Sequence, residues 1–291
     1  MHHIYYFNIN YYCNNKCIYC FSPSTERKKG YIEFHKIVDI FKTVELNSDD
    51  KIIINGGEPT LHPEFYAILE HATLFHSDVV VYSNAVKIDL SSLPPKKNIH
   101  FVIPIHGEES THNMITRNKV SFLSTINNIR ALQEDGRNVE IKFILNKNLL
   151  SSGFNIIDFL YRYRLNPTTI VLARLNKTRI SEKNNVEIPD YRDLRQYFYY
   201  YPISDLSEFA VKTIDLPPCC IGIDSQKIHI PVPPLFYFTD YQYVLKKCLY
   251  HKKVKINDNC VNCPHVHLCD ALEKSYHTLC WQGEGWKMKA E

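Results

Sequence analysis

The chain has 291 residues, of which 45% are hydrophobic and 22% charged, and it carries a formal net charge of +3. This ordinary globular composition excludes a wholly disordered chain and predicts one or two domains, at roughly 150 residues per domain. No apolar run approaches the roughly 18 residues of a membrane helix, so we expect no membrane association. The weak net charge favours no nucleic-acid partner. The N-terminus lacks a secretory signal, which predicts a cytoplasmic protein.

Ten cysteines form two clusters at opposite ends of the chain. Three lie close together near the N-terminus, and none occurs between residues 21 and 218. The others are Cys219, Cys220, Cys248, Cys260, Cys263, Cys269 and Cys280. Structural disulfides are rare in a reducing compartment, so this placement predicts metal binding or thiol chemistry.

Between the two cysteine clusters, apolar segments with strand character alternate with segments of helical period. We expect strands at 4–11, 51–55, 79–82, 99–105, 139–145 and 169–175, and helices at 33–46, 62–75, 120–134 and 154–163. Such alternation predicts an α/β fold of parallel strands with helical crossovers. A closed eight-fold barrel needs about 250 residues, so a partial (β/α)6 barrel over residues 1–176 fits better. Its chemistry is expected at the C-terminal ends of the strands.

The regular pattern ends near residue 177. Residues 177–190 are polar and predict a linker, and residues 191–201 (YRDLRQYFYYY) predict either a packing helix or strand or a substrate-facing surface. The rest of 177–291 is rich in proline and cysteine, with little periodicity. A small irregular domain of this kind typically needs a metal to stabilise it.

The first motif is Cys13-x3-Cys17-x2-Cys20, directly after the first predicted strand. Three thiolates from one loop can hold three irons of a cubane iron–sulfur cluster and leave the fourth iron open to a small molecule. The alternative is a zinc site completed by a distant residue, although zinc sites usually take four nearby ligands.

The second motif is Asn55-Gly56-Gly57-Glu58-Pro59, directly after the second predicted strand. Two adjacent glycines let the backbone approach a ligand closely. The exposed carbonyls and the Glu58 carboxylate then offer acceptors to an ammonium group. A plain strand-to-helix turn is the alternative for this motif alone.

Together, CNNKCIYC and NGGEP, in this order and each after a strand, resemble the motifs of radical S-adenosylmethionine (radical SAM) enzymes. The segment YSNA at 82–85 resembles that family's third-strand motif, and 106–118 resembles a stretch common among its peptide maturases. The resemblance covers residues 4–175. It implies a [4Fe–4S] cluster on Cys13, Cys17 and Cys20 that binds S-adenosylmethionine.

The resemblance also implies the reaction. One electron, from a donor such as flavodoxin or ferredoxin, cleaves S-adenosylmethionine to methionine and a 5′-deoxyadenosyl radical, which abstracts a hydrogen from the substrate. The site residues that the resemblance implies are Tyr19 beside the adenine, Gly56, Gly57 and Glu58 at the methionine ammonium, and Ser83 and Asn84 at the carboxylate or ribose.

The C-terminal motif Cys260-x2-Cys263-x5-Cys269 resembles the auxiliary-cluster region of SPASM or twitch domains. Glu273 stands where the SPASM pattern has a further cysteine. We therefore expect one auxiliary [4Fe–4S] cluster in domain 177–291. Its expected ligands are Cys219, Cys260, Cys263 and Cys269, with Cys220 as a substitute for Cys219. The same thiolates could instead hold a structural zinc, and Cys248 and Cys280 are spare or ligate a second cluster.

Most enzymes of this shape modify ribosomally made peptides by forming crosslinks or thioethers or by epimerising residues, so a peptide is the expected substrate. The chain starts at its first strand, so we expect a separate leader-binding protein or recognition by the barrel itself. The alternatives are a small metabolite, a cofactor precursor or a protein side chain as substrate. From another class, a non-catalytic iron–sulfur or zinc module remains an alternative, but it would have no use for the glycine-rich turn.

Overall fold

The computed structural model describes most of the chain through Ile221. Backbone and side chains are described for residues 3–22, 30–44, 46, 49–75, 78–95, 98–216 and 220–221, and the backbone alone for 218–219, 235–239, 245–254, 274–281 and 286–288. Among these residues, no helix has the length and apolar character that crossing a membrane requires.

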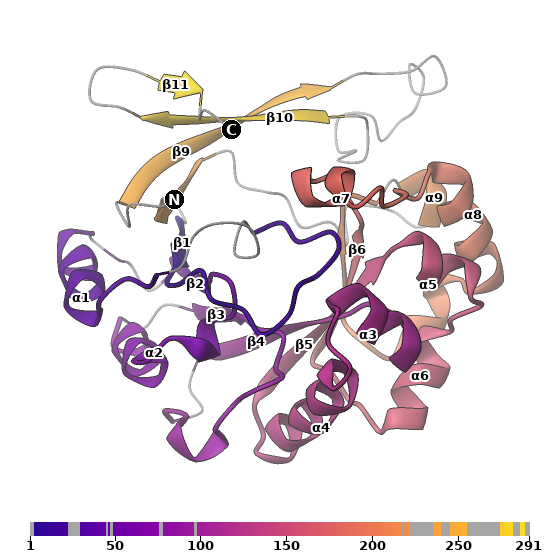
Figure 1. The fold of residues 1–291 in the computed structure, drawn as a ribbon, viewed down its shortest axis with the longest axis horizontal. Coiled ribbons are helices and arrows are strands. Elements are labelled where there is room, and N and C mark those ends of the chain that lie inside the picture. The colour runs from indigo at the N-terminus through magenta and orange to yellow at the C-terminus, as the bar shows by residue number, and fades with distance from the viewer. Residues whose placement is uncertain are drawn as a thin grey trace.

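The strands of the described residues form one curved sheet in the order β11-β10-β9-β8-β1-β2-β3-β4-β5-β6-β7 (Figure 1). The strands are β1 (Ile4–Asn8), β2 (Lys51–Asn55), β3 (Asp78–Tyr82), β4 (Ile99–Ile105), β5 (Asn138–Leu145), β6 (Thr169–Arg174), β7 (Val211–Ile214), β8 (Leu235–Thr239), β9 (Leu245–Val254), β10 (Lys274–Trp281) and β11 (Trp286–Met288). Strands β1 to β7 are all parallel, β8 pairs parallel with β1, and β9 to β11 continue antiparallel.

Helices cover the outer face of the parallel strands (Figure 1). They are α1 (Phe34–Thr43), α2 (Phe65–Thr73), α3 (Glu109–Thr116), α4 (Ser121–Glu134), α5 (Lys147–Ser151), α6 (Ile156–Tyr163), α7 (Arg179–Lys183), α8 (Tyr191–Tyr200) and α9 (Pro218–Ile221). Single turns of 3₁₀-helix lie at Pro59–Leu61, Leu90–Ser92 and Ile203–Leu206. This arrangement confirms the predicted partial α/β barrel.

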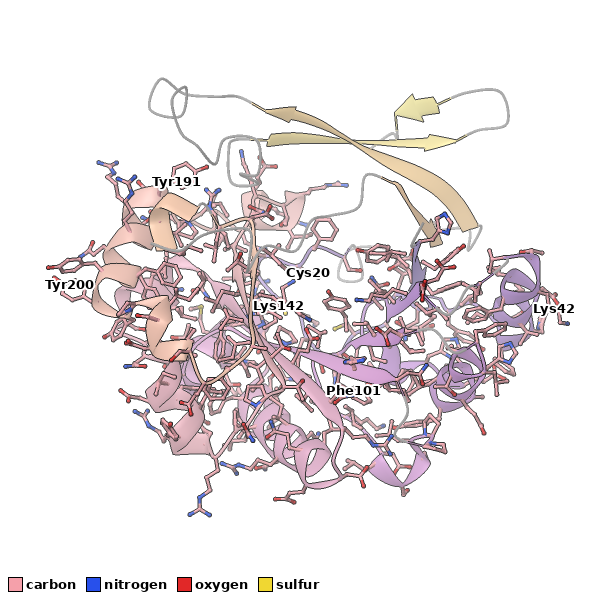
Figure 2. All side chains as sticks on the ribbon, turned by 180° about the vertical axis from the view of Figure 1, so that it is seen from behind. Cys20, Lys42, Phe101, Lys142, Tyr191 and Tyr200 are labelled. Atoms are coloured by element: carbon pink, nitrogen blue, oxygen red, sulfur yellow. The ribbon has the colours of Figure 1, made fainter. Side chains whose placement is uncertain are left out.

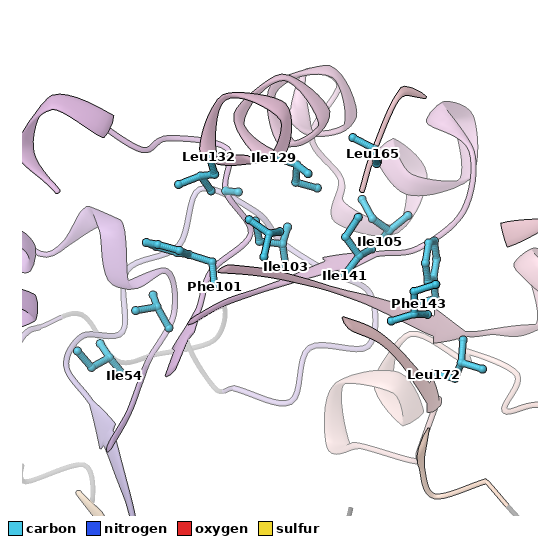
Figure 3. Packing of buried hydrophobic residues seen from close by; sticks show 14 of the residues in the cluster. Ile54, Phe101, Ile103, Ile105, Ile129, Leu132, Ile141, Phe143, Leu165 and Leu172 are labelled. Carbon is cyan, nitrogen blue, oxygen red and sulfur yellow. The ribbon is translucent and has the colours of Figure 1, made fainter. Parts of the chain in front are cut away.

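The two faces of each strand follow the period-2 alternation of its side chains. On β5, residues 139, 141, 143 and 145 are buried under the helices, whereas residues 138, 140, 142 and 144 are half-buried on the inner face. Figure 3 shows the outward set meeting the helices: Phe101 and Ile103 of β4 pack beneath Ile129 and Leu132 of α4. Fully burying each such side chain stabilises the fold by about 1.5–3 kcal/mol.

The structure adds elements that the sequence pattern did not predict. Strand β7 extends the six predicted strands to seven, but its four residues, Val-Lys-Thr-Ile, are too few to show a strand period. Helix α3 lies in a polar segment with weak periodicity. Segment 177–190 contains the short helix α7, and segment 191–201 folds as α8, whose Leu194, Tyr197 and Phe198 join the main core.

The domain boundary that the sequence places at residue 176 stays a prediction. The main hydrophobic core continues past it through α8 and α9 as far as Ile221. Within the predicted domain 177–291, the segments 222–234, 240–244, 255–273, 282–285 and 289–291 lie outside the described residues.

Candidate functional site

The segments that follow the first four strands meet at one edge of the sheet, because parallel strands end on the same side. The three N-terminal cysteines follow β1, the glycine turn follows β2, Ser83 and Asn84 follow β3, and His106 follows β4. All of these segments line one cavity of about 400 Å³ inside the curve of the sheet. The chemical motifs of the sequence are therefore parts of one site.

The cysteine loop is fixed to helix α3. The backbone amides of Lys16 and Ile18 donate to the carbonyls of Thr116 (2.9 Å) and Ile115 (3.0 Å). The buried Asn15 side chain donates to Ser121 Oγ at 3.2 Å. In Figure 1 the indigo loop after β1 crosses the open side of the sheet toward α3. These hydrogen bonds show a structural role for the segment 106–118, because it supports the loop that carries the cysteines.

Cys13, Cys17 and Cys20 are half-buried thiols, and all three line the cavity. Burial raises the pKa of Cys13 to about 12, and repulsion from Glu58 and Cys20 adds to it. Burial also raises the pKa of Cys17 well above its ordinary value, reinforced by Cys20 and Cys13. The deprotonated forms of Cys13 and Cys17 are therefore disfavoured unless a positive charge compensates their negative charge. A bound metal supplies such a charge.

An iron–sulfur cluster fits this donor set. Within the described residues, no group of three or more His, Cys, Asp or Glu side chains converges on a single metal-ion position. The cysteines nonetheless share one cavity and interact electrostatically, as their pKa values show. Three thiolates on three different irons of a cubane lie further apart than ligands of one zinc ion. A set of three thiolates therefore fits a cubane cluster, in which each thiolate binds a different iron.

The two glycines let the turn after β2 lie directly on the cysteine loop. A Cβ on Gly56, whose φ is +156°, would lie 2.5 Å from the Asn10 carbonyl oxygen. A Cβ on Gly57 would overlap the carbonyl oxygen of Tyr12. The Gly57 amide donates to Asn10 O at 2.9 Å, so the two loops are joined backbone to backbone. Both glycines also line the cavity, where the sequence predicted a close approach to a ligand.

The Glu58 carboxylate is buried at the cavity wall and joins the turns after β2 and β3. It accepts hydrogen bonds from Ser83 Oγ, the Asn84 amide and Thr60 Oγ1, each at 2.7 Å. Burial raises its pKa, and these hydrogen bonds partly oppose the shift. Glu58 was expected to hold an ammonium group; in this structure it also positions Ser83 and Asn84.

The Asn84 side chain lies beside the first cysteine. Its Nδ2 donates to Asn14 Oδ1 at 2.7 Å and lies 3.8 Å from Cys13 Sγ. Ser83 is buried against Glu58. The structure therefore places Ser83 and Asn84 at the same cavity as the three cysteines.

Tyr19 lies in the cavity wall, buried beside Ile115 and Leu175. Its hydroxyl is 2.7 Å from His106 Nδ1, and the ring of His106 lies 5.0 Å from that of His112. Burial lowers the pKa of both histidines, that of His112 to about 4, so both imidazoles are neutral at pH 7. The sequence did not predict a role for either histidine.

Several further polar residues of the cavity were missed in the sequence. They are Tyr82 on β3, Lys142 on β5, Arg174 on β6 and Asp215 after β7. For Lys142 a signal was present on β5, where NVEIKFIL places the charged residues Glu140 and Lys142 at alternate positions. A strand covered on both faces is normally apolar throughout, so charges on its inner face indicate a polar interior.

Of the predicted auxiliary-cluster ligands, Cys260, Cys263 and Cys269 lie outside the described residues, and Cys219 is described in its backbone only, on α9. Cys220 is buried in the core, with its thiol directed at the Tyr191 carbonyl at 3.7 Å. The choice between Cys219 and Cys220 as a ligand stays a prediction.

An α/β half-barrel with three neighbouring cysteine thiols and a glycine-rich turn at the C-terminal strand ends defines the class of this protein. Residues 7–147 match the model of the radical SAM superfamily. This part of the chain is a radical SAM domain.

Curated relatives agree with this assignment. The mycofactocin maturase MftC of Mycobacterium ulcerans is 28% identical over 131 residues, which cover 44% of this chain and 36% of that protein. MftC of Mycobacterium tuberculosis H37Rv is 26% identical over 177 residues, covering 60% and 39%. The subtilosin biosynthesis protein AlbA of Bacillus subtilis is 26% identical over 152 residues, covering 49% and 33%. The aligned segments thus span less than two fifths of these relatives' lengths.

Solved structures share the fold. SuiB of Streptococcus suis bound to its precursor peptide SuiA superposes with a TM-score of 0.58 at 18% identity, covering 70% of this chain and 46% of SuiB. A structure of anSMEcpe with bound AdoMet and the Kp18Cys peptide gives a TM-score of 0.65 at 14% identity, covering 92% and 88%. At such identities the likeness establishes the fold.

Proposed function

We propose that this chain is a radical SAM enzyme that modifies a ribosomally made peptide. The observation that carries the proposal is the meeting of three cysteine thiols and the Gly-Gly-Glu turn at one cavity. An electron-transfer module has no need of such a turn. The names of the relatives, maturases and a bacteriocin biosynthesis protein among them, favour a peptide over a small metabolite.

In this proposal each part of the cavity has its own task. Cys13, Cys17 and Cys20 hold a [4Fe–4S] cluster, and their burial keeps water and oxygen away from it. Gly56, Gly57 and Glu58 hold the methionine ammonium. When bound, the cluster and S-adenosylmethionine supply the carbon radical that removes a hydrogen from the substrate.

The remaining side chains orient S-adenosylmethionine. Tyr19 offers an aromatic face in the cavity wall, and Ser83 and Asn84 present polar groups at the end of β3. The hydrogen bonds from Ser83 and Asn84 to Glu58 hold these groups in place before any ligand arrives, which reduces the ordering cost of binding.

The proposal includes one auxiliary [4Fe–4S] cluster on Cys219, Cys260, Cys263 and Cys269. The buried position of the Cys220 thiol supports Cys219 as the ligand from that pair. The electron that starts the reaction comes from an external donor such as flavodoxin or ferredoxin, and peptide recognition uses either the barrel or a separate leader-binding protein.

Iron and sulfide content after anaerobic reconstitution tests both clusters. Two cubanes predict about eight irons per chain, falling to about four in the Cys13/Cys17/Cys20→Ala variant. A Cys220→Ser variant is the matched control and is expected to keep about eight. About four irons with zinc in the wild type, and none in the triple variant, would contradict the auxiliary cluster and leave the radical SAM site intact.

Turnover tests the function itself. Wild-type protein with dithionite and S-adenosylmethionine is expected to release 5′-deoxyadenosine, and the triple variant none. A deuterated peptide substrate is expected to transfer deuterium into that product. Cleavage without transfer from any peptide, but with transfer from a metabolite, would reject the peptide substrate and keep the enzyme class.

A further inference from the structure

The inner surface of the half-barrel is divided between an apolar part and a charged part. Ile53, Val80 and Val102 form an apolar layer on β2, β3 and β4. The inner face of β5 instead carries Glu140 and Lys142, and the neighbouring end of the sheet adds Lys212 and Asp215. The charged part lies beyond the strands that carry the cysteine and glycine motifs.

Most of these charges have partners. Lys212 Nζ is 2.7 Å from Glu140 Oε1, which forms an ion pair. Arg174 donates twice to the Pro189 carbonyl, each at 3.2 Å, and its guanidinium lies over the Tyr191 ring. A side-chain amide, that of Asn176, donates to Asp215.

Lys142 differs from its neighbours. Its ammonium lies 5.6 Å from the centre of the Tyr82 ring, and within the described residues it makes neither a hydrogen bond nor an ion pair. It lines the same cavity as the three cysteines. Figure 2 shows Lys142 and Cys20 inside the curve of the sheet, far from the surface residues Lys42 and Tyr200.

An ammonium in this position is costly. Burial lowers the pKa of Lys142, and the field of Asp215 offsets this only in part. The other titratable groups facing it are the neutral His106, the Tyr82 phenol and Glu140, which is already paired. A buried charge is retained at low cost only when it is paired, so the position of Lys142 favours an anionic ligand.

The side chains around Lys142 indicate what kind of anion would bind there. The cavity wall from β4 to β7 combines the apolar side chains of Val102, Pro104, Ile144, Ala173 and Ile214 with the charged Arg174 and Asp215. Arg174 already donates to the Pro189 carbonyl, so Lys142 offers a ligand one cation beside apolar groups. This combination suits a single negative charge on an organic group better than a phosphate, which needs several donors.

We propose that Lys142 binds a carboxylate of the substrate peptide, from an aspartate or glutamate side chain or from the C-terminus. This rests on the proposed function. The cofactor then occupies the side of the cavity formed after β1 to β3, and the peptide segment to be modified lies over β4 to β7. Lys142 is a specificity-determining residue that selects an acidic residue next to the reacting carbon.

The test uses a matched pair of probes, N-acetyl-glutamate N-methylamide and N-acetyl-glutamine N-methylamide. Their binding to the reconstituted, S-adenosylmethionine-loaded protein is measured by ligand-observed NMR. The glutamate probe is expected to bind about tenfold more tightly, because its carboxylate forms a charge-assisted hydrogen bond with the Lys142 ammonium and the neutral glutamine amide forms a weaker one. Lys142→Met should abolish the preference and Lys142→Arg should retain part of it.

Lys147→Met is the control, because Lys147 pairs with Asp193 outside the cavity, at 2.9 Å. It should keep the full preference. Equal binding of both probes by the wild type, or a preference that survives Lys142→Met, would overturn the proposal. Iron content shows whether each variant is folded.

S-adenosylmethionine also carries a carboxylate that Lys142 could bind. Equilibrium dialysis of S-adenosylmethionine in the absence of a probe distinguishes this carboxylate from that of the peptide. Lys142→Met is expected to bind S-adenosylmethionine as the wild type does; weaker binding would assign Lys142 to the cofactor and overturn the proposal. Failure of the proposed function would appear differently, as absence of 5′-deoxyadenosine from wild-type protein.

Discussion

Gly57 shows how a single residue determines the geometry of the site. The turn after β2 and the loop after β1 are in direct backbone contact there, with the Glu58 amide donating to the Tyr12 carbonyl at 2.6 Å. Any side chain at residue 57 would occupy the space of that carbonyl. The glycine thus sets the distance between the cysteines and the Glu58 turn.

Gly57→Ala is expected to separate the two loops. Overpacking of this kind costs about 1–3 kcal/mol of stability, and we expect weaker S-adenosylmethionine binding by equilibrium dialysis. Gly153→Ala is the control: its φ of +69° makes alanine unfavourable, but the nearest side-chain atom, Tyr201 Oη, is 3.5 Å away. It should lower the melting temperature without changing ligand binding. Normal binding by Gly57→Ala would contradict this account of the site.

At the scale of elements, the cysteine loop depends on helix α3 and the segment after it. Asn15 is the central contact: it donates to Ser121 Oγ, and its Oδ1 accepts from Asn118 Nδ2 at 2.9 Å. The loop has little regular structure, so its conformation is held by these long-range hydrogen bonds and by the backbone contacts to Ile115 and Thr116.

Asn15→Ala is expected to leave the protein folded but to loosen the loop. Losing buried hydrogen bonds costs about 1–3 kcal/mol, which corresponds to cluster loss about 5–150-fold faster under a chelator, followed by visible absorbance. Lys16→Ala is the matched control in the same loop, because the Lys16 side chain is exposed and its backbone contact remains. Equal rates for the two variants would show that the Asn15 side chain does not hold the loop.

For the whole molecule, the structure joins residues beyond 176 to the barrel. Helix α8 buries Leu194, Tyr197 and Phe198 in the main core, and its start is capped by Asp190, whose side chain accepts from the Asp193 amide at 3.0 Å. The exposed tyrosines of the same stretch, Tyr199 and Tyr200, lie on the opposite face. The Tyr-rich segment is therefore mainly a packing helix.

Leu194→Ala is expected to destabilise the entire barrel by about 2–5 kcal/mol, because a fully buried leucine leaves a cavity behind. Thermal unfolding should show one transition at lower temperature. Tyr199→Ala, 80% exposed on the same helix, should change stability by no more than about 0.5 kcal/mol. A separate low-temperature transition in Leu194→Ala would instead place the helix in an independent unit.

The sequence by itself determined the fold class, the six main strands and the motifs of the radical SAM domain, because hydrophobic period and cysteine spacing are local properties. Only the tertiary structure decided which side chains share the cavity. Residues that are far apart in the chain meet there: Glu58 contacts Ser83, and Tyr19 contacts His106. Lys142 lines the same cavity as the cysteines. They depend on the order and register of the parallel strands, which no local pattern encodes. Strand β7 was missed for the same reason: four residues acquire strand structure by pairing with β6.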